Sequence, residues 1–436
     1  MKAVIHSILV AALLIAAGWH AKRGGTAPPE GGKSDKAASE WTAAEDARGP
    51  VKLKIWMPDP MLETEIRDFQ SSNPNIDIEV VSLAGSTRIT ERYREALASG
   101  SAPDLLVLTH GMLGSFNGIE ELADLSDSPL PLAEYREQMG EYLWNIHRSL
   151  DSKRLIAVPF QTHPNVLFYR ADLFERAGFP SEPDQLAAFL EEPDHVVNLV
   201  SSLSENGIST IQWNHDFITV LSTGNYMFSP SFEFQRMSAM YRNAASVSFR
   251  TKAYIANTSI WLPEGHAMLK EGRLAAVMMP DWGENQLAEW LPEQAGLWRV
   301  TRLPLGGSSI DLVSSNSIAV TAQSRNKAAA AKFLDYLRRY SGSLNWDNST
   351  SPSPFLGGQL SKQLYLKLTL SQPVTTIPTP LDPKAFDRWR TSMEMAIDQN
   401  IPPEEMLESA KNDVLDVLAV PLEQLREFSS DWHSEQ

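Results

Sequence analysis

The run Arg154–Gly178 constrains the fold of this chain more than any other stretch of its sequence. It reads RLIAVPFQTHPNVLFYRADLFERAG and holds two short apolar segments, Leu155–Val158 and Asn165–Tyr169, separated by Pro159. Proline cannot donate a hydrogen bond to a sheet, so it interrupts the pairing between them. An amphipathic helix follows and ends at Gly178. This order of elements predicts an α/β fold in which the chain passes from one lobe to another.

The size of the chain also favours two lobes, because 436 residues exceed what one hydrophobic core usually organises. The chain has no cysteine, which excludes disulfides, thiolate metal sites and a cysteine nucleophile. Acidic residues outnumber basic residues by 54 to 38, giving a net charge of −16. That charge repels phosphate backbones and anionic bilayers, so we expect no nucleic-acid partner.

The N-terminal residues have the composition of an export signal followed by a linker. We predict a signal peptide over residues 1–18, because Lys2 precedes the apolar run Ala3–Ala17 and small residues suit a cleavage site near Gly18. Residues 19–49 are rich in glycine, proline and charge, and we predict a disordered tether there. A bacterial lipoprotein signal places a lipidated cysteine where this chain has Trp19. We therefore expect an exported protein without a lipid anchor, either released outside the cell or held at the membrane surface by an uncleaved signal.

The first folded segments predict an open α/β sheet. Val51–Met57 and Ile76–Val81 alternate as strands, and Leu62–Phe69 between them places its apolar residues on one helical face. This is a βαβ unit with parallel strands, and Leu105–Leu108 is a further strand. Later segments predict helices at Asp184–Leu190, Val196–Glu205, Phe234–Ala244, Lys327–Tyr340, Pro383–Gln399 and Pro402–Leu418, and buried strands at Ala275–Met279 and Ser317–Thr321.

Several of these segments occur in the order of a known family. They are LKIW, FQSSNPNIDIEV, ASGSAPDLLVL, AVPFQTHPNVLFYRADLFERAGFP, LKEGRLAAVMMPDW with the later LPLGG turn, and SIAVTAQSRNKAAAAKFLDYL. From about Val51 to about Val417 the chain resembles the large extracellular solute-binding proteins of carbohydrate-type bacterial ABC importers. No single segment is specific, but their shared order is.

The resemblance implies a two-lobed periplasmic-binding-protein-like fold with a ligand cleft between the lobes that closes by hinge motion. The expected first lobe is residues 50–157 and 317–367, and the expected second lobe is residues 158–316 and 368–436. The crossings should fall near Val158 and near Ser314–Ser317. The implied function is capture of a small solute, a sugar or oligosaccharide, by a monomer that delivers it to an ABC permease. A protein of this fold could instead present ligand occupancy to a membrane sensor kinase, and the sequence leaves that alternative open.

A sugar cleft needs flat aromatic faces and planar polar groups, and residues just beyond strand ends are the candidates for both. Trp56, Trp213 and Trp282 lie at such positions, although a packing role in the core is an equal alternative for the first two. Trp282 stands where the resembled family commonly keeps a cleft tryptophan. The polar candidates are Asp59, Thr109, His110, Gln161, Thr162 and Asp281, and a structural role for His110 is the stronger alternative.

The chain departs from the maltodextrin-binding pattern at three places. Gly111 stands where an acidic residue usually follows the histidine, and Tyr169-Arg170 replaces a tyrosine-asparagine pair. The late-helix tryptophan corresponds to Phe386, which we include among the candidate ligand-binding residues, with Trp389 one turn further on. These changes predict a diverged pocket whose ligand cannot be copied from a relative.

Enzyme chemistry has little support in the sequence. The histidines show no paired metal spacing, no nucleophile elbow of the GxSxG type occurs, and the adjacent carboxylates Glu191-Glu192 and Glu404-Glu405 fit solvated faces better than an acid/base pair. The glycine-rich residues 24–34 lack the first glycine of a phosphate loop and the strand before it. We therefore expect a binding protein with neither catalytic residues, metal nor cofactor.

Overall fold

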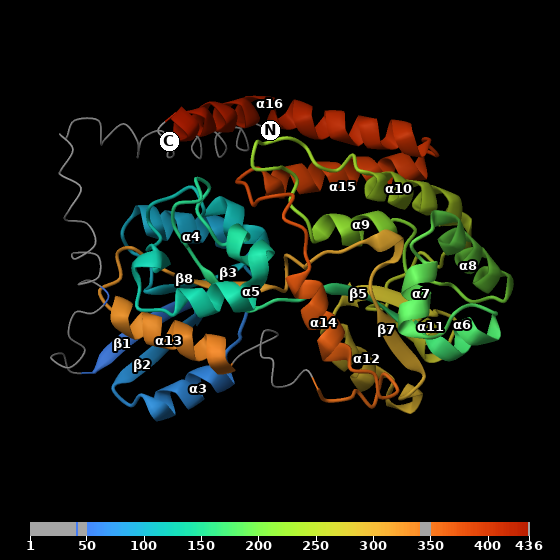
Figure 1. Ribbon diagram of the computed structural model, residues 1–436, viewed down its shortest axis with the longest axis horizontal. Helices are drawn as coiled ribbons and strands as arrows, with labels where there is room; N and C mark the ends of the chain where they lie inside the picture. The colour runs from blue at the N-terminus through green and yellow to red at the C-terminus, as the bar shows by residue number, and fades with distance from the viewer. Residues whose placement is uncertain (1–40, 42–49, 341–349, 435–436) are drawn as a thin grey trace.

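The computed structural model describes Trp41, residues 50–340 and residues 350–434 of the chain. The predicted signal over residues 1–18 and all of the predicted tether except Trp41 lie outside the described residues. The described part forms two α/β lobes side by side, with one long helix extending over both (Figure 1). None of the described helices has the length and apolar character needed to span a bilayer.

The first lobe is built on a five-stranded sheet. Its strands in spatial order are β2 (Ile76–Ser82), β1 (Val51–Met57), β3 (Leu105–Thr109), β8 (Asn316–Val320) and β4 (Val158–Gln161). β1 pairs in parallel with both β2 and β3, which confirms the predicted βαβ unit and the open α/β sheet. β8 runs antiparallel to β3 and β4, so a strand from late in the chain completes this sheet.

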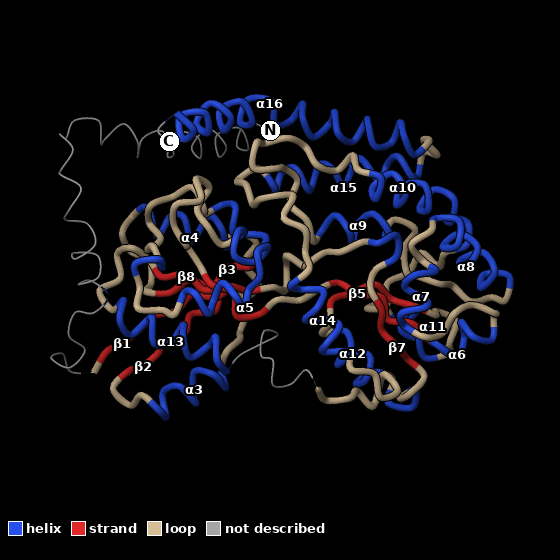
Figure 2. Tube along the Cα trace, viewed as in Figure 1, coloured by secondary structure: helices blue, strands red, loops and turns tan. Residues whose placement is uncertain are grey.

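Helices cover both faces of the first sheet (Figure 2). They are α3 (Glu63–Ser72), α4 (Ile89–Ala98), α5 (Leu132–Ile146) and α13 (Lys327–Tyr340), with short 3-10 turns at His110–Ser115 and Leu125–Asp127. Their apolar faces meet the strands in one core, and in α3 those residues are Ile66 and Phe69. Trp41 belongs to the same core and is only 4% exposed, although the sequence around it predicts a tether.

The second lobe has a three-stranded antiparallel sheet in the order β6 (Ala276–Pro280), β5 (Asn165–Arg170), β7 (Trp298–Thr301). All residues of β5 are buried, because the sheet has a core on each side. Leu167 and Tyr169 face one core, and Val166 and Phe168 face the other. Because successive side chains of a strand point to opposite faces of the sheet, β5 contributes residues to both cores.

Helices surround this second sheet on both sides (Figure 1). They are α6 (Ala171–Arg176), α7 (Pro183–Phe189), α8 (Pro193–Glu205), α9 (Asp216–Thr223), α10 (Ala239–Thr251), α11 (Pro263–Lys270), α12 (Gly283–Trp290), α14 (Ser361–Leu370), α15 (Asp382–Asp398) and α16 (Pro403–Ser434), with 3-10 turns at Lys252–Tyr254, Pro292–Gln294 and Pro304–Gly306.

The first two passages of the chain between the lobes fall near the two positions expected from the sequence. The first crossing joins β4 to β5, and the second joins β7 to β8 through residues 307–315. The chain packs closely beside the second crossing, where a Cβ atom on Gly224 would lie 2.2 Å from the Cβ of Ser309 and 2.7 Å from the backbone nitrogen of Ile310. A similar contact joins the first lobe to the segment before α15, where a Cβ on Gly114 would lie 2.2 Å from the carbonyl oxygen of Thr379. Glycine at these two positions permits the contact.

The cores place two lobe boundaries differently from the sequence-based division. β4 belongs to the first sheet, so that lobe extends to Gln161 and the crossing begins after it. Phe355 and Tyr365, which we expected in the first lobe, pack in a core of the second lobe. The chain therefore passes from the first lobe to the second between α13 and Phe355. Local sequence pattern does not indicate this passage, because amphipathic helices and loops occur in both lobes.

The last helix, α16, is longer than predicted. It packs against α15 and α10 through Met406, Leu407, Ala410 and Val414, and it continues past Leu418 until its end lies above α4 of the first lobe (Figure 1). Pro421 lies inside this helix and cannot donate the hydrogen bond that the carbonyl of Val417 would accept. Lys384 of α15 supplies it instead, with its Nζ 3.1 Å from that oxygen. The helix therefore continues across the proline.

Candidate functional site

A pocket with a volume of about 650 Å³ lies between the lobes. Its first-lobe side is formed by the segments that follow β1 and β3 and by the start of α4. Its second-lobe side is formed by residues 380–384 at the start of α15 and by the half of α16 beyond Val417, while Val313 of the second crossing also lines it. A volume of this size suits a small-molecule ligand.

Sheet topology explains why the pocket forms at this place. β1 and β3 run parallel, so their carboxyl ends open at the same edge of the first sheet. Loops at such an edge are a preferred location for ligands in α/β folds. Asp59 follows β1 and Thr109 ends β3, and both of these candidate residues line the pocket. Asp59 is exposed and Thr109 is half-buried.

Three tryptophans lie close together on the second lobe, beside the hinge, by which we mean the β4–β5 crossing and residues 307–315. Trp261 is 57% exposed, and its ring centroid is 6.3 Å from that of Trp282 and 4.7 Å from that of Trp290. Trp282 donates a hydrogen bond from Nε1 to Ser314 Oγ, 3.1 Å away. Ser314 follows pocket-lining Val313 in the chain, so Trp282 is hydrogen-bonded to the residue next to the pocket wall.

Polar contacts tie the two crossings together. His163 in the first crossing donates to Asp281 across 2.7 Å, and its backbone N–H donates to Ser315 Oγ at 3.0 Å. Asn316 donates to Gln161 Oε1 at 3.1 Å. The predicted residues Gln161, Asp281 and Trp282 thus lie together at the hinge, whereas none of the three lines the pocket.

Three predicted residues point into the protein rather than into the pocket. Trp56 packs against the first core with its ring 6.1 Å from that of Tyr93. Thr162 and His110 are fully buried, and the ring of His110 meets that of His147 edge to face at 5.1 Å. Burial lowers the pKa of His110 well below its usual range and the pKa of His147 to about 4. Both rings are therefore neutral at pH 7.

Two further predicted residues lie elsewhere in the second lobe. The ring of Trp213 stacks on that of His215 at 5.8 Å, just before α9. Phe386 lies on α15 over a small gap between α15 and α9, and the guanidinium of Arg236 is 5.8 Å from its ring centre. Trp389 is fully buried and donates to Ser222 Oγ at 3.2 Å. The structure does not bring these side chains to the pocket.

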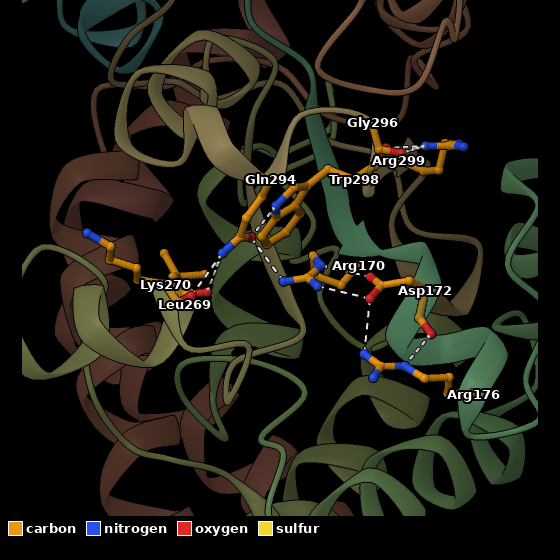
Figure 3. A network of polar contacts seen from close by, with 9 residues as sticks. All are labelled: Arg170, Asp172, Arg176, Leu269, Lys270, Gln294, Gly296, Trp298 and Arg299. Atoms are coloured by element: carbon orange, nitrogen blue, oxygen red, sulfur yellow. Dashed lines mark hydrogen bonds and ion pairs between the residues drawn. The ribbon is translucent and has the colours of Figure 1, made fainter.

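The departure at Arg170 is explained by a network inside the second lobe (Figure 3). Arg170 forms a two-pronged pair with Asp172 and donates to Gln294 Oε1 at 3.0 Å. The same oxygen accepts from Trp298 Nε1 at 2.9 Å, and Nε2 of Gln294 donates to the carbonyls of Leu269 and Lys270. The arginine joins the end of β5 to neighbouring segments of its own lobe.

Two groups of residues are not predicted from the sequence, namely those that line the pocket from α16 and the exposed tryptophan beside the hinge. Leu418, Pro421, Leu425 and Phe428 recur at spacings of three and four, which is a helical signal, but Pro421 suggests that the helix has ended. Trp261 follows no predicted strand. Its one available signal is its place beside Leu262, a pair of large apolar residues left exposed.

Comparison with known proteins agrees with this architecture. The sequence profile of the family described as bacterial extracellular solute-binding protein matches residues 65–357. The chain is similar to a lactose-binding protein of Rhizobium radiobacter, with 23% identity over 316 residues, covering 65% of this chain and 69% of that protein. Among solved structures it is similar to the sugar-binding protein MalE of Xanthomonas citri, with 16% identity, a TM-score of 0.67, and coverage of 88% of this chain and 100% of that chain.

It is also similar to the galacto-N-biose/lacto-N-biose I-binding protein of an ABC transporter from Bifidobacterium longum, with 16% identity, a TM-score of 0.66, and coverage of 86% and 98% of the two chains. These structural likenesses show a shared two-lobed fold. Because the profile match covers residues 65–357, which is more than half of the chain, the chain belongs to the bacterial extracellular solute-binding proteins.

Proposed function

We propose that this protein captures a carbohydrate between its lobes as a monomer and delivers it to an ABC importer permease in the membrane. The observation that carries the proposal is the pocket of about 650 Å³ whose walls come from both lobes. A ligand that contacts both walls binds the closed arrangement of the lobes more tightly than the open one, and so shifts the population toward closure. The permease then recognises that closed form.

Support for a carbohydrate comes from the aromatic group at the hinge and from the relatives. Trp282 donates to Ser314, the residue after pocket-lining Val313, and the Trp261 ring lies 6.3 Å from the Trp282 ring. Sugar rings stack on indole faces such as these. The similar proteins named above are described as binding lactose, galacto-N-biose or lacto-N-biose, or simply sugar. We propose that the ligand is bound and released without chemical change, because family and fold are those of binding proteins.

We also propose that the protein is exported through residues 1–18, and then is released or remains held by that segment. Trp19 has no thiol, so diacylglycerol transfer to this position has no acceptor. Mass analysis of the mature N-terminus from expressing cells tests this. A lipid-modified terminal residue would contradict it.

A thermal-shift screen against mono- and oligosaccharides tests the central proposal, because a ligand that binds only the folded state raises the melting temperature. We expect at least one sugar to raise it in a concentration-dependent way. Small-angle scattering with that sugar should show a smaller radius of gyration, as hinge closure requires. A panel without any stabilising sugar would overturn the carbohydrate assignment, and binding without compaction would overturn the closure mechanism.

A further inference from the structure

The two walls of the pocket differ in chemistry. The first-lobe wall is mostly polar, with hydroxyl and carboxylate groups from Asp59, Ser86, Thr87, Thr90, Thr109 and Ser115, and its apolar members are Pro58, Ile89 and Met112. The second-lobe wall is mostly apolar, with Pro380, Leu381, Leu418, Pro421, Leu425 and Phe428. A ligand that contacts both walls meets hydrogen-bonding groups on one side and hydrocarbon on the other. The segregation therefore favours an amphiphilic ligand.

The apolar wall is a regular feature of α16. Leu418, Pro421, Leu425 and Phe428 follow one another at intervals of three, four and three residues, which places them on one face of the helix. Val420 lies on another face and is 67% exposed. Lys384 donates a hydrogen bond to the carbonyl of Val417, and the helix continues beyond Pro421. Leu425 and Phe428 therefore line the pocket from the same helix as Leu418.

The charged side chains of the pocket balance each other. Asp59 and Glu91 are acidic, whereas Arg94 and Lys384 are basic, so the formal charge of the lining is zero. An ionised ligand would lose its hydration on entry without meeting a net opposite charge. An uncharged ligand does not incur that loss.

From these observations we infer that the pocket takes an uncharged glycoside with an apolar aglycone, the sugar against the first-lobe wall and the aglycone against the distal half of α16. This inference rests on the proposed carbohydrate-binding function and narrows its substrate class. The residues that determine specificity are then Phe428, Leu425 and Pro421. They contact the aglycone, which a free sugar lacks.

Matched pairs of synthetic glycosides test the inference. Methyl and 4-nitrophenyl glycosides of β-galactose, β-glucose and α-glucose differ only in the aglycone, and calorimetry measures the affinity of each for the full chain. We expect the 4-nitrophenyl member of the bound pair to bind about tenfold more tightly, or more, because its ring is removed from water against α16. Equal affinity within every pair would overturn the inference.

Two substitutions locate the aglycone. Phe428→Ser should abolish most of the preference for the 4-nitrophenyl glycoside and leave the affinity for the methyl glycoside within about twofold. Val420→Ser, on the same helix but facing solvent, is the matched control and should change neither affinity. Pro383→Ser alters an exposed residue of the same wall and serves as a second test should Phe428→Ser fail to fold. Equal weakening of both glycosides by the wall variants would overturn the placement.

The outcomes also distinguish a failure of this inference from a failure of the proposed carbohydrate-binding function. If free sugars bind as tightly as the 4-nitrophenyl glycosides, the carbohydrate function stands and the aglycone inference fails. If n-octanol binds and no sugar or glycoside does, both fail. A preference for aryl glycosides that Phe428→Ser removes supports both.

Discussion

Lys384 donates a hydrogen bond from Nζ to the carbonyl oxygen of Val417 across 3.1 Å, and Pro421 is the reason that this oxygen is available. In an uninterrupted helix the N–H four residues later would occupy it, but proline has none. Lys384 is half-buried and lines the pocket together with Pro421. The proline that lacks the backbone N–H and the lysine that replaces its hydrogen bond therefore both lie at the pocket wall.

Pro421→Ala restores the missing N–H and should raise the free energy of unfolding by about 1–3 kcal/mol, because the helix regains a backbone hydrogen bond and loses a steric conflict. Urea denaturation measures the change. Pro403→Ala, at the first helical position where proline has no such cost, is the control and should change stability little. Lys384→Met should destabilise the natural chain by about 1 kcal/mol, but the Pro421→Ala chain by less. Equal effects in both chains would contradict the link.

The exposed tryptophan beside the hinge should matter for binding rather than for stability. Trp261→Ala and Trp282→Ala should each weaken binding of the sugar found in the screen by about 1–3 kcal/mol, measured by calorimetry. Trp261→Ala should leave the melting temperature nearly unchanged, since the side chain is 57% exposed. Trp213→Ala is the control. Trp213 does not line the pocket and stacks on His215 just before α9, so this substitution should not affect affinity. A loss of affinity in that variant alone would point to a site near α9 instead.

Asp216 should make the protein less stable at neutral pH than at mildly acidic pH. Burial raises the pKa of its carboxyl from 3.8 to about 7, while Trp213 N–H donates to it at 3.1 Å and opposes the rise. Between these two values the folded state keeps a proton that the unfolded chain has lost, so the group's contribution to stability falls as pH rises.

Asp216→Asn keeps an acceptor for Trp213 N–H and removes the titrating group. It should raise the free energy of unfolding at pH 8 by about 2–4 kcal/mol and flatten its decline from acidic pH. Denaturation at a series of pH values measures both effects. Glu205→Gln, an exposed carboxyl on α8, is the control and should leave the pH profile unchanged. A profile of Asp216→Asn parallel to that of the natural chain would show that Asp216 is not the group responsible.

Trp41 should contribute to the stability of the first lobe despite its distance in sequence from the other core residues. Its side chain is 4% exposed and lines a small pocket with Leu122, Asp124 and Arg154. Trp41→Ala should lower the free energy of unfolding by about 2–4 kcal/mol, because it removes a large buried apolar surface. Trp261→Ala makes the same chemical change at an exposed position and should cost far less. A loss below that of Trp261→Ala would mean that Trp41 is not packed in solution.

Local periodicity predicted most of the fold. The strands β1 and β2 lie within one residue of their expected bounds, and α3 begins one residue late and ends three residues past Phe69, because alternation and helical spacing are properties of adjacent residues. The antiparallel partnership of β3 with β8 could not be predicted this way, since Leu105 pairs with Val320 and no local pattern records so distant a pairing. The end of α16 was also missed, because Lys384 compensates for Pro421 from another helix.

The site was less predictable than the fold, for a related reason. A position just after a strand restricts a side chain to one edge of a sheet, and this was enough to place Asp59 and Thr109 at the pocket. It does not say whether the side chain turns outward or inward, and His110, adjacent to Thr109, turns inward against His147. Residues of α16 reach the pocket only through tertiary packing, which the sequence of that helix does not encode alone.

The connectivity of the first sheet sets the order in which the protein can fold during synthesis. β1, β2 and β3 are made early, but β8, which joins β3 to β4, comes roughly two hundred residues later than β3. Until that strand emerges from the ribosome, β3 has an open edge and the early part of the chain has no complete sheet. Contacts between such distant residues form slowly. The first lobe of a nascent chain of this design can therefore close only after β8, residues 316–320, has been synthesised.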